Sequence, residues 1–245
     1  MSRSANPRQS DRTQESGEPQ VTHAMEDYLK AVWRLREAGG PVTTQRLAEE
    51  LGVSGPSVTN MAKRLHDLRL VRHTRYHGVE LTPAGEKIAL EVLRHHRLLE
   101  LYLAEALGYA WHQVHEEAER LEHHVSDELE ARMDSALGYP KRDPHGDPIP
   151  SREGTIDVVT AVPLAELEPG ESARVARVSD RDPERLRYLG ELGLYPGAAL
   201  TLVEILPFDG PLRVRIEETE HLISRSLASA VSVDRVAPTE SSPGR

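Results

Sequence analysis

The pattern of apolar residues changes once along this chain of 245 residues. Up to about Leu137 apolar side chains recur at the three- and four-residue spacing of helices. Residues 141–150 are too rich in proline for a helix or a central strand, and short β-branched runs separated by Pro and Gly follow them. The sequence therefore predicts a mainly α-helical protein with a small all-β domain at its C-terminal end.

Three short helices are expected near the N-terminus. The first spans about 25–37 and ends at Gly39-Gly40-Pro41, and the second, capped by Thr43 or Thr44, breaks at Gly52. Gly55-Pro56 opens the third. Two short helices joined by a tight glycine turn form a helix-turn-helix. Strand-like runs on either side of His77-Gly78 predict a hairpin directly after it, which is a wing.

Longer helices are predicted over about 83–107 and 111–137, the second as one continuous helix ending at Gly138. The proline-rich residues 141–150 are interpreted as a surface connection. Strands are expected at 173–178, 199–205, 212–216 and 230–233, with one helix near 182–192, which indicates a small β-barrel. The predicted organisation is a disordered tail (1–20), a winged helix-turn-helix domain (21–83), a helical domain (84–150), a linker (151–160), the small β-domain (161–237) and a tail (238–245).

Composition excludes several classes of protein. The chain has no cysteine, so disulfides, thiolate nucleophiles and Cys-ligated zinc are absent. The mean hydropathy is −0.51, and no apolar run approaches the ~18–20 residues of a membrane span. The first twenty residues lack the apolar core of a secretory signal. We therefore expect a cytoplasmic location.

Charge is divided unevenly along the chain, whose net charge is −10. Residues 22–82 carry nine Lys/Arg against seven Asp/Glu, whereas 83–150 carry seven against fourteen. The acidic segment also holds seven of the twelve histidines. Carboxylates and imidazoles gathered together are what a hard or borderline divalent cation needs. A solvated acidic helix face with scattered histidines is the alternative that composition leaves open.

Spacing favours the metal site. On a continuous helix, His115, Glu119, Glu122 and His123 fall on one face, because i, i+4, i+7 and i+8 share a face. His96 and Glu100 on the preceding helix are also i and i+4. A single histidine here is typically a surface residue. Three carboxylates and three imidazoles packed together without a cation would instead suffer Coulomb repulsion.

A separate set of residues is suited to DNA. Polar side chains near the start of the third helix lie where a recognition helix contacts base edges, and basic side chains follow that can meet phosphates. The candidates are Ser54, Pro56, Ser57, Thr59, Asn60, Lys63, Arg64 and Arg75, with Arg69, Arg72, His73 and His77 as further phosphate contacts. A winged helix that mediates only protein contacts is the alternative.

The order of these motifs resembles the diphtheria-toxin-repressor family of bacterial metal-dependent transcription regulators, including its manganese-sensing branch. The matching stretches are Met25-Glu-Asp-Tyr-Leu, Ser54-Gly-Pro-Ser-Val-Thr-Asn60, Leu81-Thr-Pro-Ala-Gly85, His95-His-Arg-Leu-Leu-Glu100, 115–127 and Pro144-His-Gly-Asp-Pro-Ile-Pro150. Residues 115–127 are the most specific. Gly190-Glu-Leu-Gly-Leu-Tyr-Pro-Gly197 resembles the SH3-like, FeoA-type domain of longer members.

The resemblance implies two metal sites. It assigns Asp27, Glu119, Glu122 and His123 to the primary, activating site. It assigns His96, Glu100 and His115 to a second site, to which the SH3-like domain contributes side chains, here Asp182 or Glu184. Ser54, Pro56, Ser57 and Asn60 match positions where the family's recognition helix meets bases.

Departures from the family pattern bear on the metal. Asp27 and Glu119 stand where the iron-sensing branch has Met and Cys, and oxygen-rich coordination suits Mn(II) better than metals that prefer sulfur. The resemblance therefore implies Mn(II), with Fe(II) as the alternative. The short manganese sensors place a Glu one turn after the Asp of the first helix, where this chain has Lys30. A protonated lysine is a poor ligand, so their paired-metal arrangement is in doubt here.

The function implied is a regulator, expected to repress metal-uptake genes, in which a bound cation fixes the recognition helices of a homodimer for a palindromic operator on double-stranded DNA. Residues 125–137 are the expected dimer interface. One alternative is a metallohydrolase whose Glu/His face activates water, although no general base or substrate motif is evident. Another is a DNA-binding protein with a purely structural metal. The SH3-like domain could also bind a proline-rich peptide such as residues 144–150.

Overall fold

The computed structural model describes residues 21–74, 78–158 and 160–236. The predicted tails, 1–20 and 238–245, lie outside these residues. The chain forms two compact units that divide after Thr82. Each unit has its own buried core and is described by itself.

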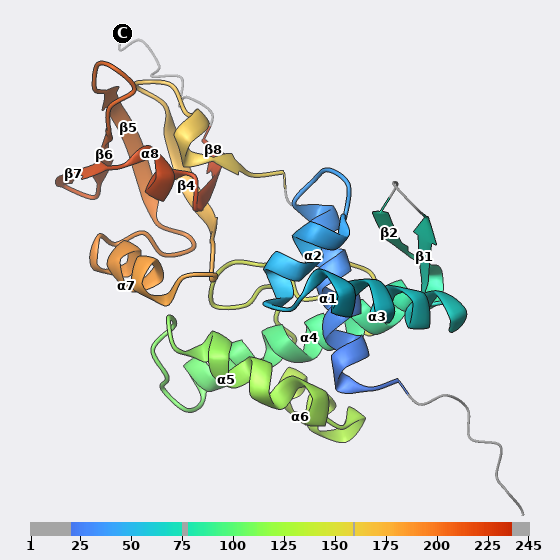
Figure 1. Cartoon of the computed structure of the whole chain (residues 1–245). Coiled ribbons are helices and arrows are strands. Elements are labelled where there is room, and N and C mark those ends of the chain that lie inside the picture. The colour runs from blue at the N-terminus through green and yellow to red at the C-terminus, as the bar shows by residue number, and fades with distance from the viewer. Residues whose placement is uncertain (1–20, 75–77, 159, 237–245) are drawn as a thin grey trace, which may run out of the picture. The chain divides into compact units, whose positions relative to one another are not determined.

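The N-terminal unit is a three-helix core followed by a two-stranded hairpin (Figure 1). Its elements are α1 (His23–Glu37), α2 (Thr44–Leu51), α3 (Gly55–Asp67), β1 (Val71–Thr74) and β2 (Gly78–Leu81). The strands pair antiparallel, with Val71 opposite Leu81. The turn between them, which includes Arg75 and His77, lies outside the described residues. This is the winged helix-turn-helix that the sequence predicts.

Local chemistry sets the turn between α2 and α3. The Thr43 side chain accepts a hydrogen bond from the backbone N–H of Arg46, which confirms Thr43 as the cap of α2. Gly52 ends α2 with φ of 64°, a left-handed conformation that glycine adopts without steric cost. Ser54 caps α3 by accepting from the N–H of Ser57. Val58 and Leu65 then face the core.

The helical part of the second unit contains α4 (Pro83–Glu105), α5 (Val114–Leu121), the 3₁₀ turn η1 (Glu122–His124) and α6 (Asp127–Ala136). Figure 1 shows these helices in shades of green. The prediction of one continuous helix over 111–137 is wrong. Val125 is extended, and the Ser126 side chain caps α6 by accepting from the N–H of Leu129, so two helices meet at a turn.

The proline-rich segment is not a surface connection. Asp143, His145 and residues 148–150 are buried, although Lys141 and Arg142 are exposed. Without helix or sheet, the segment satisfies its polar groups through side chains: Asp143 Oδ1 accepts from the backbone N–H groups of His145 and Asp147. The segment therefore belongs to the interior of the second unit.

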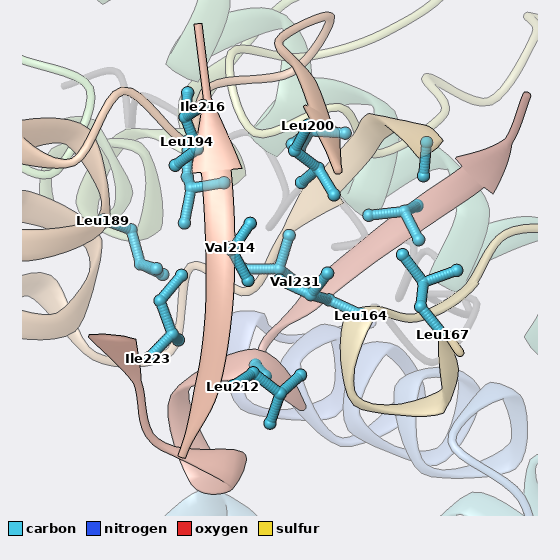
Figure 2. Close-up of a cluster of buried hydrophobic side chains, with 14 of the residues drawn as sticks. Leu164, Leu167, Leu189, Leu194, Leu200, Leu212, Val214, Ile216, Ile223 and Val231 are labelled. Atoms are coloured by element: carbon cyan, nitrogen blue, oxygen red, sulfur yellow. The ribbon is translucent and has the colours of Figure 1, made fainter. Parts of the chain in front are cut away.

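The C-terminal part is an antiparallel sheet in the order β3-β8-β4-β5-β6-β7. Its elements are β3 (Val162–Pro163), η2 (Leu164–Glu166), β4 (Ser172–Val178), α7 (Pro183–Glu191), β5 (Ala199–Ile205), β6 (Leu212–Ile216), β7 (Thr219–Ile223), α8 (Arg225–Ala228) and β8 (Val231–Arg235). The strands β3 and β7 were not expected from the sequence. Inward-facing aliphatic side chains such as Leu164, Val214 and Val231 form its core (Figure 2).

Candidate metal centre

The centre is built on α4, which buries polar side chains in its second half. His96 and Glu100 lie one turn apart with 1% and 0% of their surfaces exposed, and His96 Nε2 is 3.0 Å from Glu100 Oε1. Burying a carboxylate costs free energy unless it is paired, so such a pair requires partners from neighbouring elements. Those partners come from both sides of His96 and define two clusters.

The first cluster lies at the junction of α5 and η1. Glu122 is fully buried, with Oε2 2.6 Å from His96 Nδ1 and Oε1 3.5 Å from His123 Nε2. Glu119 Oε1 is 3.9 Å from His96 Nδ1. Glu119 at the end of α5 and Glu122 at the start of η1 thus both face His96, and His123 of η1 faces Glu122.

The second cluster adds side chains from α5 and from the loop after β4. His115 Nδ1 is 3.1 Å from Glu100 Oε1 and 3.2 Å from Asp180 Oδ2. Single ligand atoms of His96, Glu100, His115 and Asp180 all lie within 4.8 Å of one another. Two carboxylates and two imidazoles thus converge at one point.

Charges in the second cluster are strongly coupled. Burial lowers the pKa of His115, but hydrogen bonds to Asp180 and Glu100 outweigh it and raise that pKa to about 10. Burial raises the pKa of Glu100, but the charge of His96 and the close approach of three imidazoles hold it well below its usual value. The metal-free cluster is therefore held together by protonated imidazole and ionised carboxylate.

Glu100 also faces the proline-rich segment. Its Oε2 is 3.7 Å from His145 Nδ1, and single ligand atoms of Glu100, Asp143 and His145, all buried, lie within 4.8 Å of one another. His145 Nε2 donates to the carbonyl of Trp111 at 2.7 Å, which leaves Nδ1 turned toward Glu100. Burial raises the pKa of Asp143 well above its usual value. Burial lowers the pKa of His145, but the neighbouring charge of Glu100 outweighs it and raises that pKa to about 9.

A divalent cation suits these donors. Within the described part of the chain, Glu100 Oε2 and His145 Nδ1 are buried and have no hydrogen-bond partner. These two atoms lie 3.7 Å apart, too far for a hydrogen bond, and buried polar atoms normally have a hydrogen-bond partner. Both atoms could therefore serve as ligands to a cation. Oxygen and imidazole ligands fit manganese, iron or zinc and offer no thiolate.

Asp182 and Glu184, the candidate ligands from the C-terminal domain, are not among the residues that converge on the second cluster. Asp182 caps α7, with Oδ1 accepting from the N–H groups of Glu184 and Arg185, and Glu184 is exposed. Asp180, two residues before Asp182, is the carboxylate of this loop that lies close to His115. Asp27 lies near the start of α1, in the N-terminal unit.

Sequence reasoning missed Asp143, His145 and Asp180 as members of the centre. Their distance along the chain from the other ligands hid them. The one available signal was a histidine and an aspartate inside a short proline-rich stretch of an acidic region. Of the assigned residues, the structure brings Glu119 and Glu122 to His96 with His123 beside Glu122, and it joins His96, Glu100 and His115 at the second cluster.

The candidate DNA-contacting residues gather on α3. Ser54, Pro56, Ser57, Asn60, Lys63 and Arg64 are exposed, and Thr59 is half-buried with its hydroxyl donating to the carbonyl of Gly55. Arg75 lies outside the described residues. Exposed polar and basic side chains at the start of the second helix of a helix-turn-helix are the arrangement that enters a DNA groove.

Comparisons with known proteins agree with this architecture. Residues 20–79 match the iron dependent repressor N-terminal DNA binding domain, 82–151 the iron dependent repressor metal binding and dimerisation domain, and 162–235 the FeoA domain. The iron-dependent repressor IdeR of Mycobacterium tuberculosis is 31% identical over 229 residues, which cover 89% of this chain and 99% of IdeR. The chain belongs to the diphtheria-toxin-repressor family.

Solved structures of family members share the fold over most of this chain. A manganese-dependent transcriptional repressor in complex with manganese has a TM-score of 0.82 and 39% identity, covering 86% of this chain and all of that chain. The repressor ScaR with bound Cd²⁺ has a TM-score of 0.74 and 33% identity, covering 86% of this chain and 99% of ScaR. The family consists of metal-dependent DNA-binding repressors and not of enzymes, so the metallohydrolase alternative is excluded. Among the described residues, none of the helices combines the length and hydropathy that a membrane span requires.

Proposed function

We propose that this protein is a transcriptional repressor whose binding to DNA depends on a divalent metal ion, with Mn(II) preferred to Fe(II). The observation that carries the proposal is the convergence of buried Glu122 and Glu100 on the two ring nitrogens of His96. Two buried carboxylates around one imidazole are suited to a cation. The absence of cysteine makes the ligand set oxygen-rich, which favours Mn(II).

The primary site would be formed by Asp27, Glu119, Glu122 and His123. In the second unit, Glu119 and Glu122 face His96, and His123 faces Glu122. Asp27 is assigned by the sequence resemblance alone. When bound, the cation supplies positive charge that neutralises the carboxylates. Because Asp27 belongs to the helix-turn-helix unit, a site that uses all four side chains would link metal binding to DNA binding, and each would strengthen the other by the same factor.

The second site would be formed by His96, Glu100, His115 and Asp180. These residues replace the set that included Asp182 or Glu184. Asp143 and His145 lie on the far side of Glu100, where His145 is oriented by its hydrogen bond to Trp111. Because the ligands come from three separate parts of the second unit, occupancy of this site would hold those parts together.

The DNA site would be the exposed face of α3. Ser54, Pro56, Ser57, Thr59 and Asn60 are proposed to meet base edges, while Lys63, Arg64 and Arg75 meet phosphates. In a homodimer, two such helices would enter major grooves about 34 Å apart on a palindromic operator. We further propose that the genes controlled are those of metal uptake.

The test is a titration of DNA binding. Purified protein stripped with a chelator would be mixed with fluorescent DNA from upstream of its own gene, and anisotropy followed at fixed salt as Mn(II) or Fe(II) is added without oxygen. We expect affinity to rise with either metal and at a lower free concentration of Mn(II). DNA of scrambled sequence is the control for binding that depends only on charge.

Two outcomes would contradict the proposal. Equal DNA affinity with and without metal would make the clusters structural. A response to Fe(II) at a lower free concentration than to Mn(II) would retain the metal-dependent repressor but reverse the preference. Zn(II) is a useful third titrant, because intrinsic affinities of N/O sites rise toward the later first-row metals.

A further inference from the structure

The segment 143–147 contacts the C-terminal sheet where β4 ends. The carbonyl of His145 accepts from the N–H of Val178 at 2.8 Å, and Asp147 Oδ1 accepts from Arg177 at 3.0 Å. The register of β4 against β8 shifts between Val175 and Arg177, so the strand is irregular here and its end is available to a neighbour outside the sheet. Asp180 of the second cluster follows Val178 by two residues.

The same segment is tied to α4 on its other side. Arg97, the neighbour of His96, donates to the carbonyl of Pro148 at 2.5 Å, and its guanidinium lies 3.5 Å from Asp147 Oδ1. Asp147 Oδ1 thus faces two arginines, one on α4 and one on β4. A continuous path of contacts runs from the helix that carries His96 and Glu100 to the strand that precedes Asp180.

Gly146 allows the closest approach in this path. Its φ is +90°, and a Cβ atom there would overlap the carbonyl oxygen of Ala176 and lie 2.9 Å from the Cα of Arg177. Both obstacles are backbone atoms of β4, which cannot rotate away as a side chain can. Only glycine lets the backbone of the segment lie against β4 at this distance.

We propose that Gly146 and Asp147 are positioning residues: they dock β4 against the segment and so place Asp180 at the second metal site. The inference rests on the proposed function of that site. Neither residue belongs to the proposed ligand set of that site. Their effect reaches a bound cation through Asp180, because His115 meets Asp180 only while the end of β4 is held.

The experiment compares Gly146→Ala with Gly170→Ala in the full-length protein. Gly170 has the same φ of +90°, but a Cβ atom there would meet nothing within 4 Å. The two variants therefore share the backbone strain, and only Gly146→Ala adds the overlap with β4. Hydrogen exchange of the Val178 amide in metal-free protein reports docking, and calorimetry with Mn(II) reports the number and affinity of metal sites.

We expect Gly146→Ala to exchange the Val178 amide faster and to weaken the second Mn(II) site by about tenfold or more, the range seen when a supporting residue of a metal site is removed. The primary site should retain its affinity. Gly170→Ala should match the wild type in both measurements. Circular dichroism checks that each variant is folded.

A second pair of variants guards against misfolding of Gly146→Ala. Arg177→Met removes the contact with Asp147, and Arg213→Met removes an exposed arginine that pairs with Glu204 at 2.8 Å. Both remove one positive charge from the same sheet. We expect only Arg177→Met to weaken the second site.

The outcomes separate this inference from the proposed function. Suppose that Asp180→Asn weakens the second site but Gly146→Ala leaves its Mn(II) affinity unchanged. That result overturns the positioning role, whatever the exchange rate of the Val178 amide. A second site that is absent from the wild type, or that survives Asp180→Asn, overturns both the proposed ligand set and this inference. Loss of the second site in Gly146→Ala and Arg177→Met, with both controls normal, supports the positioning role.

Discussion

The two clusters share His96 but are assembled from very different lengths of chain. Glu119, Glu122 and His123 lie within five residues at the junction of α5 and η1, where Glu119 and Glu122 face the imidazole of His96 and His123 faces Glu122. Around Glu100, by contrast, the side chains come from α4, α5 and the loop after β4, with Asp143 and His145 alongside. The first cluster depends on local backbone conformation, and the second on the docking of whole elements.

Because of this difference, different kinds of mutation should disrupt the two clusters. The side chains of the first cluster keep their arrangement as long as α5 and η1 form, so we expect its metal affinity to be lost mainly when a ligand is removed. A cluster of distant residues also fails when any contact that aligns its elements is broken. His96, whose two ring nitrogens face one cluster each, is the physical link between them.

The largest expected effect comes from Glu122→Gln. The amide keeps the size of the side chain but removes the buried negative charge that faces His96 and His123. We expect metal-dependent DNA affinity to fall by about 100-fold or more, measured by anisotropy at saturating Mn(II). Mutation of a residue that only supports a metal ligand already lowers metal affinity about 10–100-fold, and Glu122 is a proposed ligand itself.

The matched control for that variant is Glu204→Gln. Glu204 is exposed on β5 and pairs with Arg213 at 2.8 Å, so the charge change is the same and its loss affects only a surface contact. A Glu122→Gln protein that binds DNA in response to Mn(II) as the wild type does would disprove the role of the first cluster.

A smaller effect is expected from Asp180→Asn. This variant should weaken the second Mn(II) site by about 10–100-fold in calorimetry while leaving the primary site filled. Asp182→Asn is the control, because asparagine caps a helix as well as aspartate does and should preserve α7. If Asp182→Asn weakened the site more than Asp180→Asn, the assignment of the ligand from this loop would be reversed.

Affinity at the second site should also rise with pH. The pKa of His115 is raised to about 10, so its imidazole is protonated in the metal-free protein at neutral pH. A metal ligand must be the neutral imidazole, so binding displaces that proton. Below pH 10, apparent affinity should therefore increase about tenfold per pH unit for each proton released.

The measurement is calorimetry between pH 6.5 and 8.5 in two buffers of different ionisation enthalpy, which counts the protons released. His145, with a pKa of about 9, would release a second proton if it also became a ligand. Mn(II) binding to the second site without proton release would show that His115 is not a ligand.

The smallest effect should come from Ser126→Ala. The Ser126 side chain caps α6 and so stabilises the turn that joins η1 to α6. Its loss should lower the free energy of unfolding by about 1 kcal/mol, measured by urea denaturation of the metal-free protein. Ser126→Asn, which restores a cap, should recover most of that stability.

The metal affinity of Ser126→Ala tests whether the two metal sites form independently. We expect the first site to weaken slightly and the second to remain as in the wild type, because only the first depends on this turn. Equal weakening of both sites would indicate that the two clusters form one cooperative unit through His96.

Much of the fold was predictable because its signals are local. Thr43, Gly52 and Ser54 mark the helix-turn-helix through capping and a left-handed turn, and these act over a few residues. The error over 111–137 is also local in origin: apolar spacing continues across Val125, and only the cap at Ser126 shows the break. A serine followed by acidic residues in a new first turn was the signal available.

The candidate site was predictable only in part. His96, Glu100, His115, Glu119, Glu122 and His123 repeat at helical spacing, so periodicity groups them. The family resemblance points to Asp182 or Glu184 and does not single out Asp180, because sequence gives no measure of where this loop ends and the helix begins. In the structure the Asp182 carboxylate accepts hydrogen bonds from backbone N–H groups at the start of α7, whereas the Asp180 carboxylate lies 3.2 Å from His115 Nδ1.

Three features of this protein can be recognised in its amino-acid sequence: the helix-turn-helix, the change from helices to strands, and the concentration of carboxylates and imidazoles in residues 83–150. Each follows from propensity, capping or charge, which act between near neighbours. The burial of the proline-rich segment and the grouping of Asp143, His145 and Asp180 with Glu100 become visible only in the folded protein. Buried charges must find partners wherever packing provides them, and packing brings together residues that lie far apart along the chain.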